Sequence, residues 1–291
     1  MKAPQVIVLG CGSIGRRHIA NLTELGCRVS AFDPDPRRLA WVVKKLGAEP
    51  LASAEQGLNI RPDAAWICVP PHRHAELALS ALKRRVPCFL EKPLAHTLAA
   101  GRRIAQAATH ARVPVAVGYQ MRFHPVLRWI KKGLDAGRWG KLMFLRAQLG
   151  QYLPDWRPWQ DYRSSYTGKR SQGGGVLLDS SHELDLARWF AGEPRSVYCL
   201  ARKLSRLQVD VEDTAALVLE HRSGAVSEVH LDMVSRGPRR SLELACSDAT
   251  VVWDNPSATL SVYSAKAKRW NVQPRPFVAN EIYIAETKAF L

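Results

Sequence analysis

The stretch Gln5-Val-Ile-Val-Leu-Gly-Cys-Gly-Ser-Ile-Gly15 decides the fold of this chain. Its first five residues are apolar enough for a buried strand, and the glycines that follow have the spacing G-x-G-x-x-G at the start of a helical pattern. Gly10 permits a tight turn, Gly12 lets a pyrophosphate approach the backbone, and Gly15 lets the helix pack closely on the strand. The helix N-terminus offers its N–H groups to the phosphates. This order of strand, turn and helix predicts a dinucleotide-binding site.

Strand and helix patterns alternate along the first 122 residues. Apolar strand runs lie at 5–9, 28–32, 64–69, 87–90 and 113–117, and helical patterns at 14–25, 37–46, 74–83 and 97–108. Alternation of this kind predicts a doubly wound parallel sheet with helices on both faces. We therefore expect residues 1–122 to form one α/β dinucleotide-binding Rossmann domain.

Longer strand runs dominate the chain after residue 122. They lie at 141–149, 196–203, 214–221, 225–232, 241–245, 250–254 and 259–264, while 125–133 and 181–190 have helical patterns. Arg222-Ser-Gly224 between two of the runs is a hairpin signal. Residues 123–291 are thus expected to form an α+β domain with a large, mostly antiparallel sheet, for substrate binding and oligomerisation. Residues 282–291 look helical without an ending signal, so we expect a C-terminal segment to be missing.

The charge of the chain restricts its partners. With 42 basic and 26 acidic side chains among 291 residues, the formal net charge is +16. The basic residues are scattered in pairs without a nucleic-acid-binding motif, so we expect an anionic small molecule and no nucleic acid as partner. No apolar run approaches the roughly twenty residues of a transmembrane helix, and no membrane partner is expected.

Six cysteines are spread through the chain without the paired spacing of a zinc site. We interpret them as reduced thiols of a cytoplasmic protein. Cys11 lies inside the glycine motif, where the alternatives are a redox sensor and, as we favour, a small residue in a tight turn. Since no cluster of potential ligands has metal-binding spacing, we expect no catalytic metal.

Asp33 ends the second predicted strand, eighteen residues after Gly15. A carboxylate there accepts hydrogen bonds from the adenosine ribose and repels a 2′-phosphate, which favours NAD. Arg37 and Arg38 keep NADP open as an alternative, because either can bind a 2′-phosphate. The contacts expected around this end of the cofactor are Gly10, Gly12, Ser13, Ile14, Gly15, Asp33 and Arg38.

Three further motifs accompany the glycine motif. Glu91-Lys92-Pro93 follows the fourth predicted strand, Gly118–Pro125 (GYQMRFHP) follows the fifth, and Gly173–Asp185 (GGGVLLDSSHELD) comes later. With these four motifs the chain closely resembles, over nearly its whole length, the glucose–fructose oxidoreductase/inositol dehydrogenase/MocA (Gfo/Idh/MocA) family. The resemblance implies a nicotinamide enzyme that acts on sugars, cyclitols or their derivatives.

The resemblance also implies roles for individual residues. Lys92 takes the place beside the reacting carbon, and Glu91 contacts the nicotinamide side of the cofactor. Pro70, Pro71 and His74 match the segment that passes under the cofactor. Gln120 and Arg122 match positions near the nicotinamide and the domain hinge.

The chemistry of an alcohol oxidation agrees with a lysine at this place. The alcohol must lose its proton as hydride leaves for the nicotinamide. A lysine whose pKa is lowered by burial or by cationic neighbours assists that step, and its ammonium form stabilises an alkoxide. Lys92, which is followed by a proline at a strand end, is our candidate rather than a solvated surface lysine.

Asp179, His182 and Asp185 have the spacing i, i+3, i+6, which places them along one side of a helix. By resemblance His182 is the family's active-site histidine, an acid/base group or a substrate ligand. The better-known sugar dehydrogenases of the family place the aspartate four residues before the histidine, whereas here Asp179 lies three before it. A complete Lys-Asp-His set is therefore not implied. The alternative interpretation is that Ser180-x-x-Glu183 is a capping box of a helix start.

Residues 152–169 (YLPDWRPWQDYRSSYTGK) are rich in aromatic and cationic side chains and are expected to form a loop. Such a loop can close over a sugar, with Trp156 or Trp159 stacking, and with Arg163 or Lys169 binding an anion. A packed loop or a subunit contact is the alternative. The expected substrate contacts are Lys92, Arg122, Tyr162, Arg163, Asp179 and His182.

These observations favour an NAD(P)-dependent enzyme that transfers a hydride between the nicotinamide and a secondary alcohol or ketone of a sugar-like, anionic substrate. A redox-silent NAD-binding sensor of the same fold is the alternative from another class. Reduction of an imine, or an internal cycle that regenerates the cofactor, would keep the enzyme but change the reaction. The resemblance implies a homodimer or homotetramer, formed through the open face of the C-terminal sheet.

Overall fold

The computed structural model of the chain describes residues 3–291, which divide into two compact units. Unit 1 contains the chain up to Tyr119, together with Ser171–Gly173 and Tyr283–Leu291. Unit 2 contains Gln120–Arg170 and Gly174–Ile282. Unit 1 therefore ends three residues before the expected domain boundary. It also takes in the end of the chain, because Phe290 packs on the rings of Trp66 and Phe89 inside unit 1.

Unit 1 is built on a six-stranded sheet with the order β3-β2-β1-β4-β5-β6, in which every pair is parallel. The strands are β1 (Gln5–Leu9), β2 (Arg28–Phe32), β3 (Glu49–Pro50), β4 (Ala64–Ile67), β5 (Cys88–Glu91) and β6 (Val115–Gly118). The helices between them are α1 (Ser13–Glu24), α2 (Pro36–Leu46), α3 (Ala54–Asn59), α4 (His74–Lys83) and α5 (Leu98–Ala111). The predicted Rossmann fold is thus confirmed. The elements β3 and α3 were not predicted, since two and six residues are too short to show a period.

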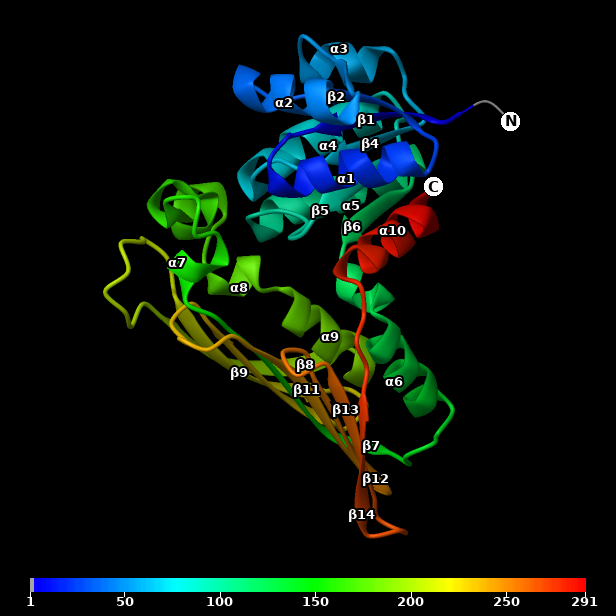
Figure 1. Cartoon of the computed structure of the whole chain (residues 1–291), viewed down its shortest axis with the longest axis vertical. Coiled ribbons are helices and arrows are strands. Elements are labelled where there is room, and N and C mark those ends of the chain that lie inside the picture. The colour runs from blue at the N-terminus through cyan, green and yellow to red at the C-terminus, as the bar shows by residue number, and fades with distance from the viewer. Residues whose placement is uncertain (1–2) are drawn as a thin grey trace. The chain divides into compact units, whose positions relative to one another are not determined.

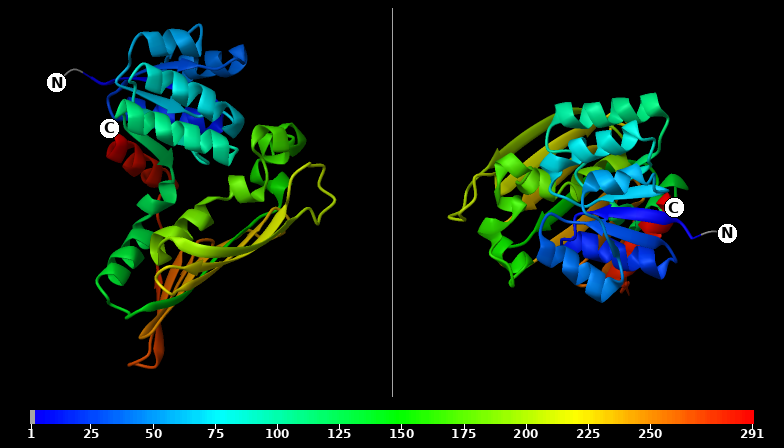
Figure 2. Two further views of the ribbon diagram at one scale, coloured as in Figure 1. Left: turned by 180° about the vertical axis from the view of Figure 1, so that it is seen from behind. Right: turned by 90° about the horizontal axis from the view of Figure 1, so that it is seen from above.

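Two apolar cores lie on opposite faces of this sheet, because alternate residues of a strand point to opposite faces. Ile7, Leu9 and Ile67 belong to the core under α3, α4 and α5. Val6 and Val8 belong to the other core, under α1 and α2, together with Trp66. Figure 1 shows α1 and α2 on the near side of the sheet, and Figure 2 shows the other helices from behind.

Unit 2 contains an eight-stranded sheet with the order β14-β13-β12-β11-β7-β10-β9-β8. Its strands are β7 (Leu142–Gly150), β8 (Pro194–Arg202), β9 (Thr214–His221), β10 (Val226–Asp232), β11 (Arg239–Cys246), β12 (Ala249–Asp254), β13 (Thr259–Ser264) and β14 (Arg269–Pro274). All neighbours are antiparallel except β10 and β7, which confirms the mostly antiparallel sheet. Strand β14 was not predicted, because its residues are nearly all exposed and lack an apolar alternation. The predicted hairpin turn is present, with Gly224 at φ +87°.

One face of the large sheet carries helices. They are α6 (Pro125–Asp135), α8 (Val176–Asp179) and α9 (His182–Ala191), and they pack on strands of unit 2. A short α7 (Leu153–Trp156) lies in the loop after β7, and α10 (Ala279–Phe290) ends the chain. No described helix of unit 2 covers the opposite face of the sheet (Figure 1).

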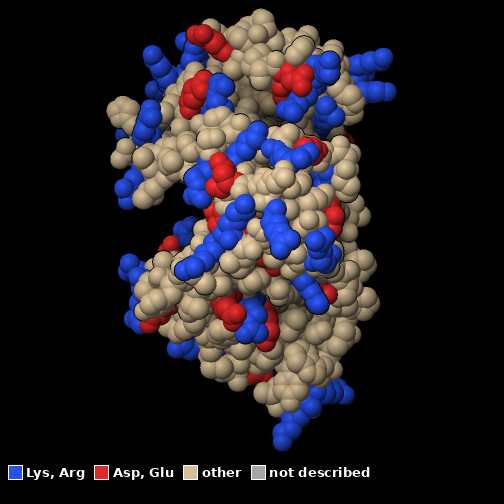
Figure 3. Space-filling model, turned by 90° about the vertical axis from the view of Figure 1, so that its left-hand side faces the viewer, with Lys and Arg blue, Asp and Glu red and all other residues tan. Residues whose placement is uncertain are grey.

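On the face that Figure 3 shows, Lys and Arg side chains are spread out and interleaved with Asp and Glu. A basic stripe of the kind that binds nucleic acid is not seen on that face. Within residues 3–291, no helix has the length and apolar character needed to cross a bilayer.

Candidate active site

The three glycines of the motif meet different surroundings. Gly10 has φ +101°, and a Cβ there would lie 2.6 Å from the carbonyl oxygen of Cys68. A Cβ on Gly15 would lie 1.8 Å from the carbonyl oxygen of Gly10. Gly12, at the N-terminus of α1, has no atom within 4 Å of its Cβ position. The turn is therefore closed on the protein side and open at Gly12, and this open position at a helix N-terminus fits a pyrophosphate.

Asp33 is buried at the end of β2 and binds the backbone. Its Oδ2 accepts the N–H of Cys11 at 2.7 Å, and its Oδ1 accepts the N–H of Asp35 at 2.9 Å. Asp33 thus holds the glycine turn in place, a role that the sequence interpretation did not include. The exposed Arg38 pairs with Asp35, with 3.4 Å between Nε and Oδ2.

The alternative of a redox sensor at Cys11 receives no support. Burial, followed by the negative charge of Asp33, raises the pKa of the Cys11 thiol to about 12. A thiol is nucleophilic in its thiolate form, so a buried thiol of this kind is inert. Cys11 is a small residue in a tight turn.

Lys92 follows directly on β5. The preceding Glu91 binds the ring of His18, with 2.8 Å between its Oε1 and Nε2 of the histidine, and its Oε2 accepts the N–H of Lys92 at 3.2 Å. The peptide bond between Lys92 and Pro93 is cis. Next to it, Nδ1 of His74 lies 2.9 Å from the carbonyl oxygen of Pro93. The position of Lys92 is thus defined by side chains from α1 and α4.

The segment after β4 forms a single turn of 3-10 helix, Pro71–Arg73. His74 is fully buried behind it, and its Nε2 lies 2.9 Å from the carbonyl oxygen of Val69. Burial lowers the pKa of His74. A Cβ on Gly173 would lie 2.8 Å from Cβ of Pro71, so the first glycine of the later motif packs on this segment. Pro70 and Pro71 keep their expected place at the end of a strand, while His74 binds main-chain oxygens within the protein.

The Asp179–His182 segment of unit 2 differs from its predicted form. Asp179 ends α8 and His182 begins α9, because the helix is interrupted at Ser180 and Ser181. The prediction that Asp179, His182 and Asp185 lie along one side of a single helix is therefore wrong. The capping box is also wrong. Ser181 is the N-cap and makes no side-chain cap bond, and Glu183 instead accepts Nε of Arg240 at 2.8 Å.

Asp179 is held by two hydroxyl donors from the preceding loop. The hydroxyl of Tyr166 donates to its Oδ1 at 2.9 Å, and Oγ1 of Thr167 donates to its Oδ2 at 2.7 Å. His182 is buried, with 5% exposure. The sequence interpretation missed Tyr166 and Thr167, which carry no signal beyond their place in a polar loop.

Arg122 and Gln120 lie on a 3-10 turn, Gln120–Phe123, at the start of unit 2. The guanidinium of Arg122 binds Asp185 through two hydrogen bonds, of 2.8 Å and 2.7 Å. Asp185 is buried, so this ion pair fixes the turn to α9. Arg122 therefore has a structural contact in addition to the role expected by resemblance.

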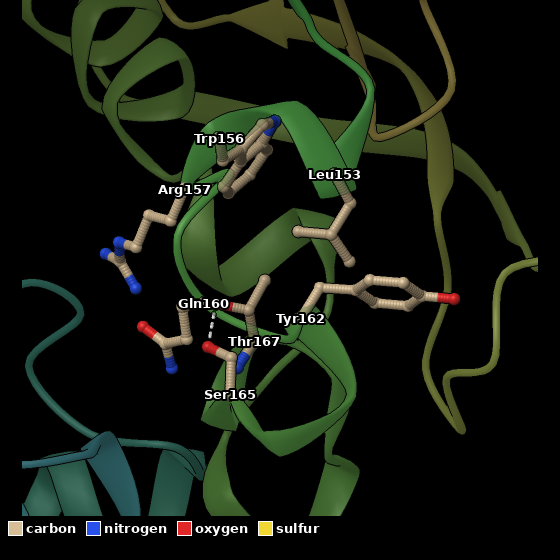
Figure 4. Close-up of a pocket in the computed structure, with 7 residues that line it drawn as sticks. All are labelled: Leu153, Trp156, Arg157, Gln160, Tyr162, Ser165 and Thr167. Atoms are coloured by element: carbon tan, nitrogen blue, oxygen red, sulfur yellow. Dashed lines mark hydrogen bonds between the residues drawn. The ribbon is translucent and has the colours of Figure 1, made fainter.

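The loop 152–169 lines a small, open hollow with about 20 Å³ of free space, about enough for one water molecule (Figure 4). Its walls are Leu153, Trp156, Arg157, Gln160, Tyr162, Ser165 and Thr167. Arg163 instead pairs with Asp161 at 2.8 Å, and Trp159 is 80% exposed. Figure 4 shows the polar ends of Arg157 and Gln160 on the same side of the loop, and neither residue was singled out from the sequence.

The residues assigned to hydride transfer are divided between the units. Lys92 belongs to unit 1, and Asp179 and His182 belong to unit 2. Over the described range 3–291, no group of three or more His, Cys, Asp or Glu side chains is arranged to hold a metal ion.

Comparison with known proteins identifies both units. Residues 5–119 match the model of the oxidoreductase family with an NAD-binding Rossmann fold, and residues 127–252 match the Gfo/Idh/MocA C-terminal domain. The chain belongs to the Gfo/Idh/MocA family. The resemblance inferred from the motifs is thus confirmed, and so is the expectation of an NAD site in unit 1.

Individual relatives agree with this assignment. The chain is 31% identical, over 237 residues, to inositol 2-dehydrogenase 2 of Saccharopolyspora erythraea. The aligned region covers 77% of this chain and 65% of the relative. The chain thus spans just under two thirds of that relative's length. Levoglucosan dehydrogenase in complex with NADH superposes with a TM-score of 0.89 at 21% identity, over 99% of this chain and 89% of that one. The WlbA dehydrogenase of Bordetella pertussis, in complex with NADH and UDP-GlcNAcA, has a TM-score of 0.78 at 25% identity. The superposition covers 87% of this chain and 79% of that one.

Proposed function

We propose that this protein is an NAD(P)-dependent oxidoreductase that transfers a hydride between the nicotinamide and a secondary alcohol or ketone of a sugar, nucleotide-sugar or cyclitol-type substrate. One observation carries the proposal: the open glycine turn and Lys92 follow the carboxyl ends of β1 and β5 in one parallel sheet. In open α/β sheets, ligands bind in the crevice outside the carboxyl ends of the strands. NAD is the favoured cofactor, with NADP as the alternative.

The residues of unit 1 bind the cofactor and supply a cationic side chain in this proposal. NAD, when bound, supplies the acceptor or donor of the hydride. The helix N-terminus at Gly12 binds the pyrophosphate, with Ser13 and Ile14 in the first turn. The amine of Lys92 takes the hydroxyl proton or, as ammonium, stabilises the alkoxide. The segment of Pro70 and Pro71 supports the cofactor from the neighbouring strand end.

Unit 2 supplies acid/base groups and contacts to the substrate. We assign His182 to proton transfer or to a substrate hydroxyl. Asp179, fixed as an acceptor by Tyr166 and Thr167, orients either the histidine or a hydroxyl of the substrate. Arg122, Tyr162 and Arg163 remain proposed substrate contacts, and Arg157 and Gln160 join them as candidates for an anionic group.

The relatives support the substrate class. The inositol 2-dehydrogenase supports a cyclitol or sugar, and the WlbA dehydrogenase complex supports a nucleotide sugar that carries an acidic group. The net charge of +16 agrees with an anionic substrate. Unpaired cysteines, five of the six buried, support a reducing compartment such as the cytoplasm.

A second copy of the chain is the proposed partner on the bare face of the large sheet. On this face the edge strand β8 exposes Tyr198 to 71% and Leu200 to 59%, and Val218 of β9, which pairs with Tyr198, is 43% exposed. Exposed apolar residues that gather on one element are typical of interaction sites. A homodimer or homotetramer would cover them, and sedimentation velocity measures which one forms.

The test is turnover, followed at the near-UV absorbance of the reduced nicotinamide with a panel of inositols, sugar acids and nucleotide sugars. We expect activity with a member of the panel, and we expect Lys92→Met to abolish turnover while NAD still binds. Lys83→Met removes an exposed lysine of the same unit and serves as the matched control. Full activity in Lys92→Met would overturn the mechanism. NAD binding without turnover of any substrate would favour the redox-silent sensor.

A further inference from the structure

Two fully buried histidines flank Lys92 in unit 1, and the proposed reaction uses neither of them. His18 lies on α1 and His74 at the start of α4, each with 0% exposure. Burying a polar ring costs free energy unless hydrogen bonds compensate it. The partners of the two rings therefore show what the histidines do.

His18 binds Glu91, the residue before Lys92. The distance between Nε2 and Oε1 is 2.8 Å, and a carboxylate only accepts, so the ring N–H donates. The rings of Phe89 and Tyr283 pack edge-on against the imidazole, at 5.2 and 6.2 Å between centroids, and fix its plane. The second oxygen of Glu91 accepts the N–H of Lys92. His18 thereby controls the peptide group on the N-terminal side of Lys92.

A second carboxyl group, that of Glu286, lies near Glu91. Burial and the negative charge of Glu91 raise the pKa of Glu286 to about 9. At neutral pH Glu286 therefore keeps its proton.

His74 binds the chain on the other side of Lys92. Its two ring nitrogens lie 2.9 Å from the carbonyl oxygens of Pro93 and Val69. A neutral imidazole carries one N–H and a carbonyl oxygen only accepts, so the ring donates to one of these two oxygens and packs against the other. In the tautomer with the proton on Nδ1, His74 holds the carbonyl of Pro93 in the turn after β5. Lys92 thus lies between Glu91, which His18 binds, and Pro93, whose carbonyl oxygen faces His74.

We propose that His18 and His74 are positioning residues that clamp the backbone of Lys92 from both sides. This inference rests on the function proposed above, in which Lys92 acts on the substrate. Because His18 lies on α1, whose N-terminus is the proposed pyrophosphate site, the clamp also joins the cofactor-binding helix to Lys92. A small displacement of a catalytic group is costly, since an error of about 1 Å can lower a rate by roughly 100-fold.

Paired variants separate the clamp from simple packing. His18→Phe and His74→Phe keep a ring in each place but remove its N–H donors. His18→Gln places an amide N–H near the position of Nε2, and His74→Asn places one near the position of Nδ1. His221→Phe is the matched control, because His221 is an equally buried histidine of unit 2, bonded to Ser227.

Two measurements are made on each variant. Hydrogen exchange of the peptide that contains residues 89–94 reports the amide of Lys92 and needs no substrate. Steady-state kinetics with the substrate found for the wild type separate kcat from KM. We expect the two phenylalanine variants to lose kcat by roughly 10- to 100-fold, with the KM of the substrate unchanged. The same variants should exchange faster at 89–94, and the two amide variants should recover both properties.

The outcomes distinguish this inference from the function itself. Unchanged exchange and kcat in the phenylalanine variants overturn the clamp, and so does an equal loss in His221→Phe. An equal loss in the amide variants also overturns it, because ring packing would then be the cause. If exchange responds as expected but Lys92→Met keeps full turnover, the clamp stands and the proposed function fails.

Discussion

The glycine turn of unit 1 and the Asp179–His182 segment of unit 2 are built in different ways. The turn is determined by main-chain contacts within a few residues, since a Cβ on Gly15 would touch the carbonyl oxygen of Gly10. In unit 2, side chains from distant positions hold α9, the helix that begins at His182, in place. Asp185 binds Arg122, 63 positions away, and Glu183 binds Arg240, 57 positions away.

Because of this difference, different kinds of substitution should disrupt the two sites. A main-chain turn fails when a Cβ is added where backbone atoms already fill the space, as at Gly15. A segment held by side-chain pairs fails when one partner of a buried pair is removed. The predictions that follow probe the turn first, and then the buried titratable groups of the two units.

The largest effect is expected for Gly15→Ala. Its Cβ would lie 1.8 Å from the carbonyl oxygen of Gly10, so α1 must move away from β1. We expect a loss of about 3 kcal/mol or more in the free energy of unfolding, at the upper end for overpacking, and loss of NAD binding. Chemical denaturation and NAD titration measure the two effects.

Gly12→Ala is the matched variant within the same turn. No atom lies within 4 Å of its Cβ position, so the fold should persist while NAD affinity falls, because the methyl group takes the place of the pyrophosphate. If Gly12→Ala bound NAD as tightly as the wild type, the assignment of the phosphate site would be wrong. Normal stability in Gly15→Ala would contradict the steric argument.

The same contrast explains how much could be predicted from the sequence. The Rossmann unit was predicted nearly element by element, because glycine spacing and apolar runs act over short distances. The partners of Asp179 were not predicted, because Tyr166 and Thr167 lie in a loop whose sequence specifies no single conformation. The bond between His18 and Glu91 spans 73 positions, and no local pattern reports it.

The second prediction concerns Glu286 in unit 1, whose folded pKa of about 9 exceeds its ordinary value of 4.5. The groups that face it are Glu91, Cys68 and Tyr283. An acid with a raised folded pKa stabilises the protein below its unfolded pKa, and this stability is lost as pH rises through the folded pKa. Wild type should therefore lose stability between about pH 4.5 and 9, and Glu286→Gln should lose less.

Thermal unfolding at pH 5, 7 and 9 measures this difference. Glu281→Gln, an exposed change on the same helix α10, is the control and should follow the wild type. A pH dependence in Glu286→Gln that is identical to that of the wild type would show that Glu286 is not buried as a neutral acid.

The smallest effect is expected at the acid end of the pH range, from His124 in unit 2. This histidine packs between Trp253 and Phe277, and burial, together with the charge of Arg240, lowers its pKa from 6.5 to about 4. A base with a lowered folded pKa stabilises the protein above its unfolded pKa, and this stability is lost as pH falls from 6.5 towards 4. His124→Asn keeps an acceptor for the N–H of Val126 at the start of α6 but cannot titrate. The variant should be less stable than the wild type at pH 7, because it loses the ring contacts, and the gap should narrow at pH 4.5 in thermal unfolding. A constant gap would mean that His124 does not titrate on unfolding, and the acid sensitivity of unit 2 would then need another source.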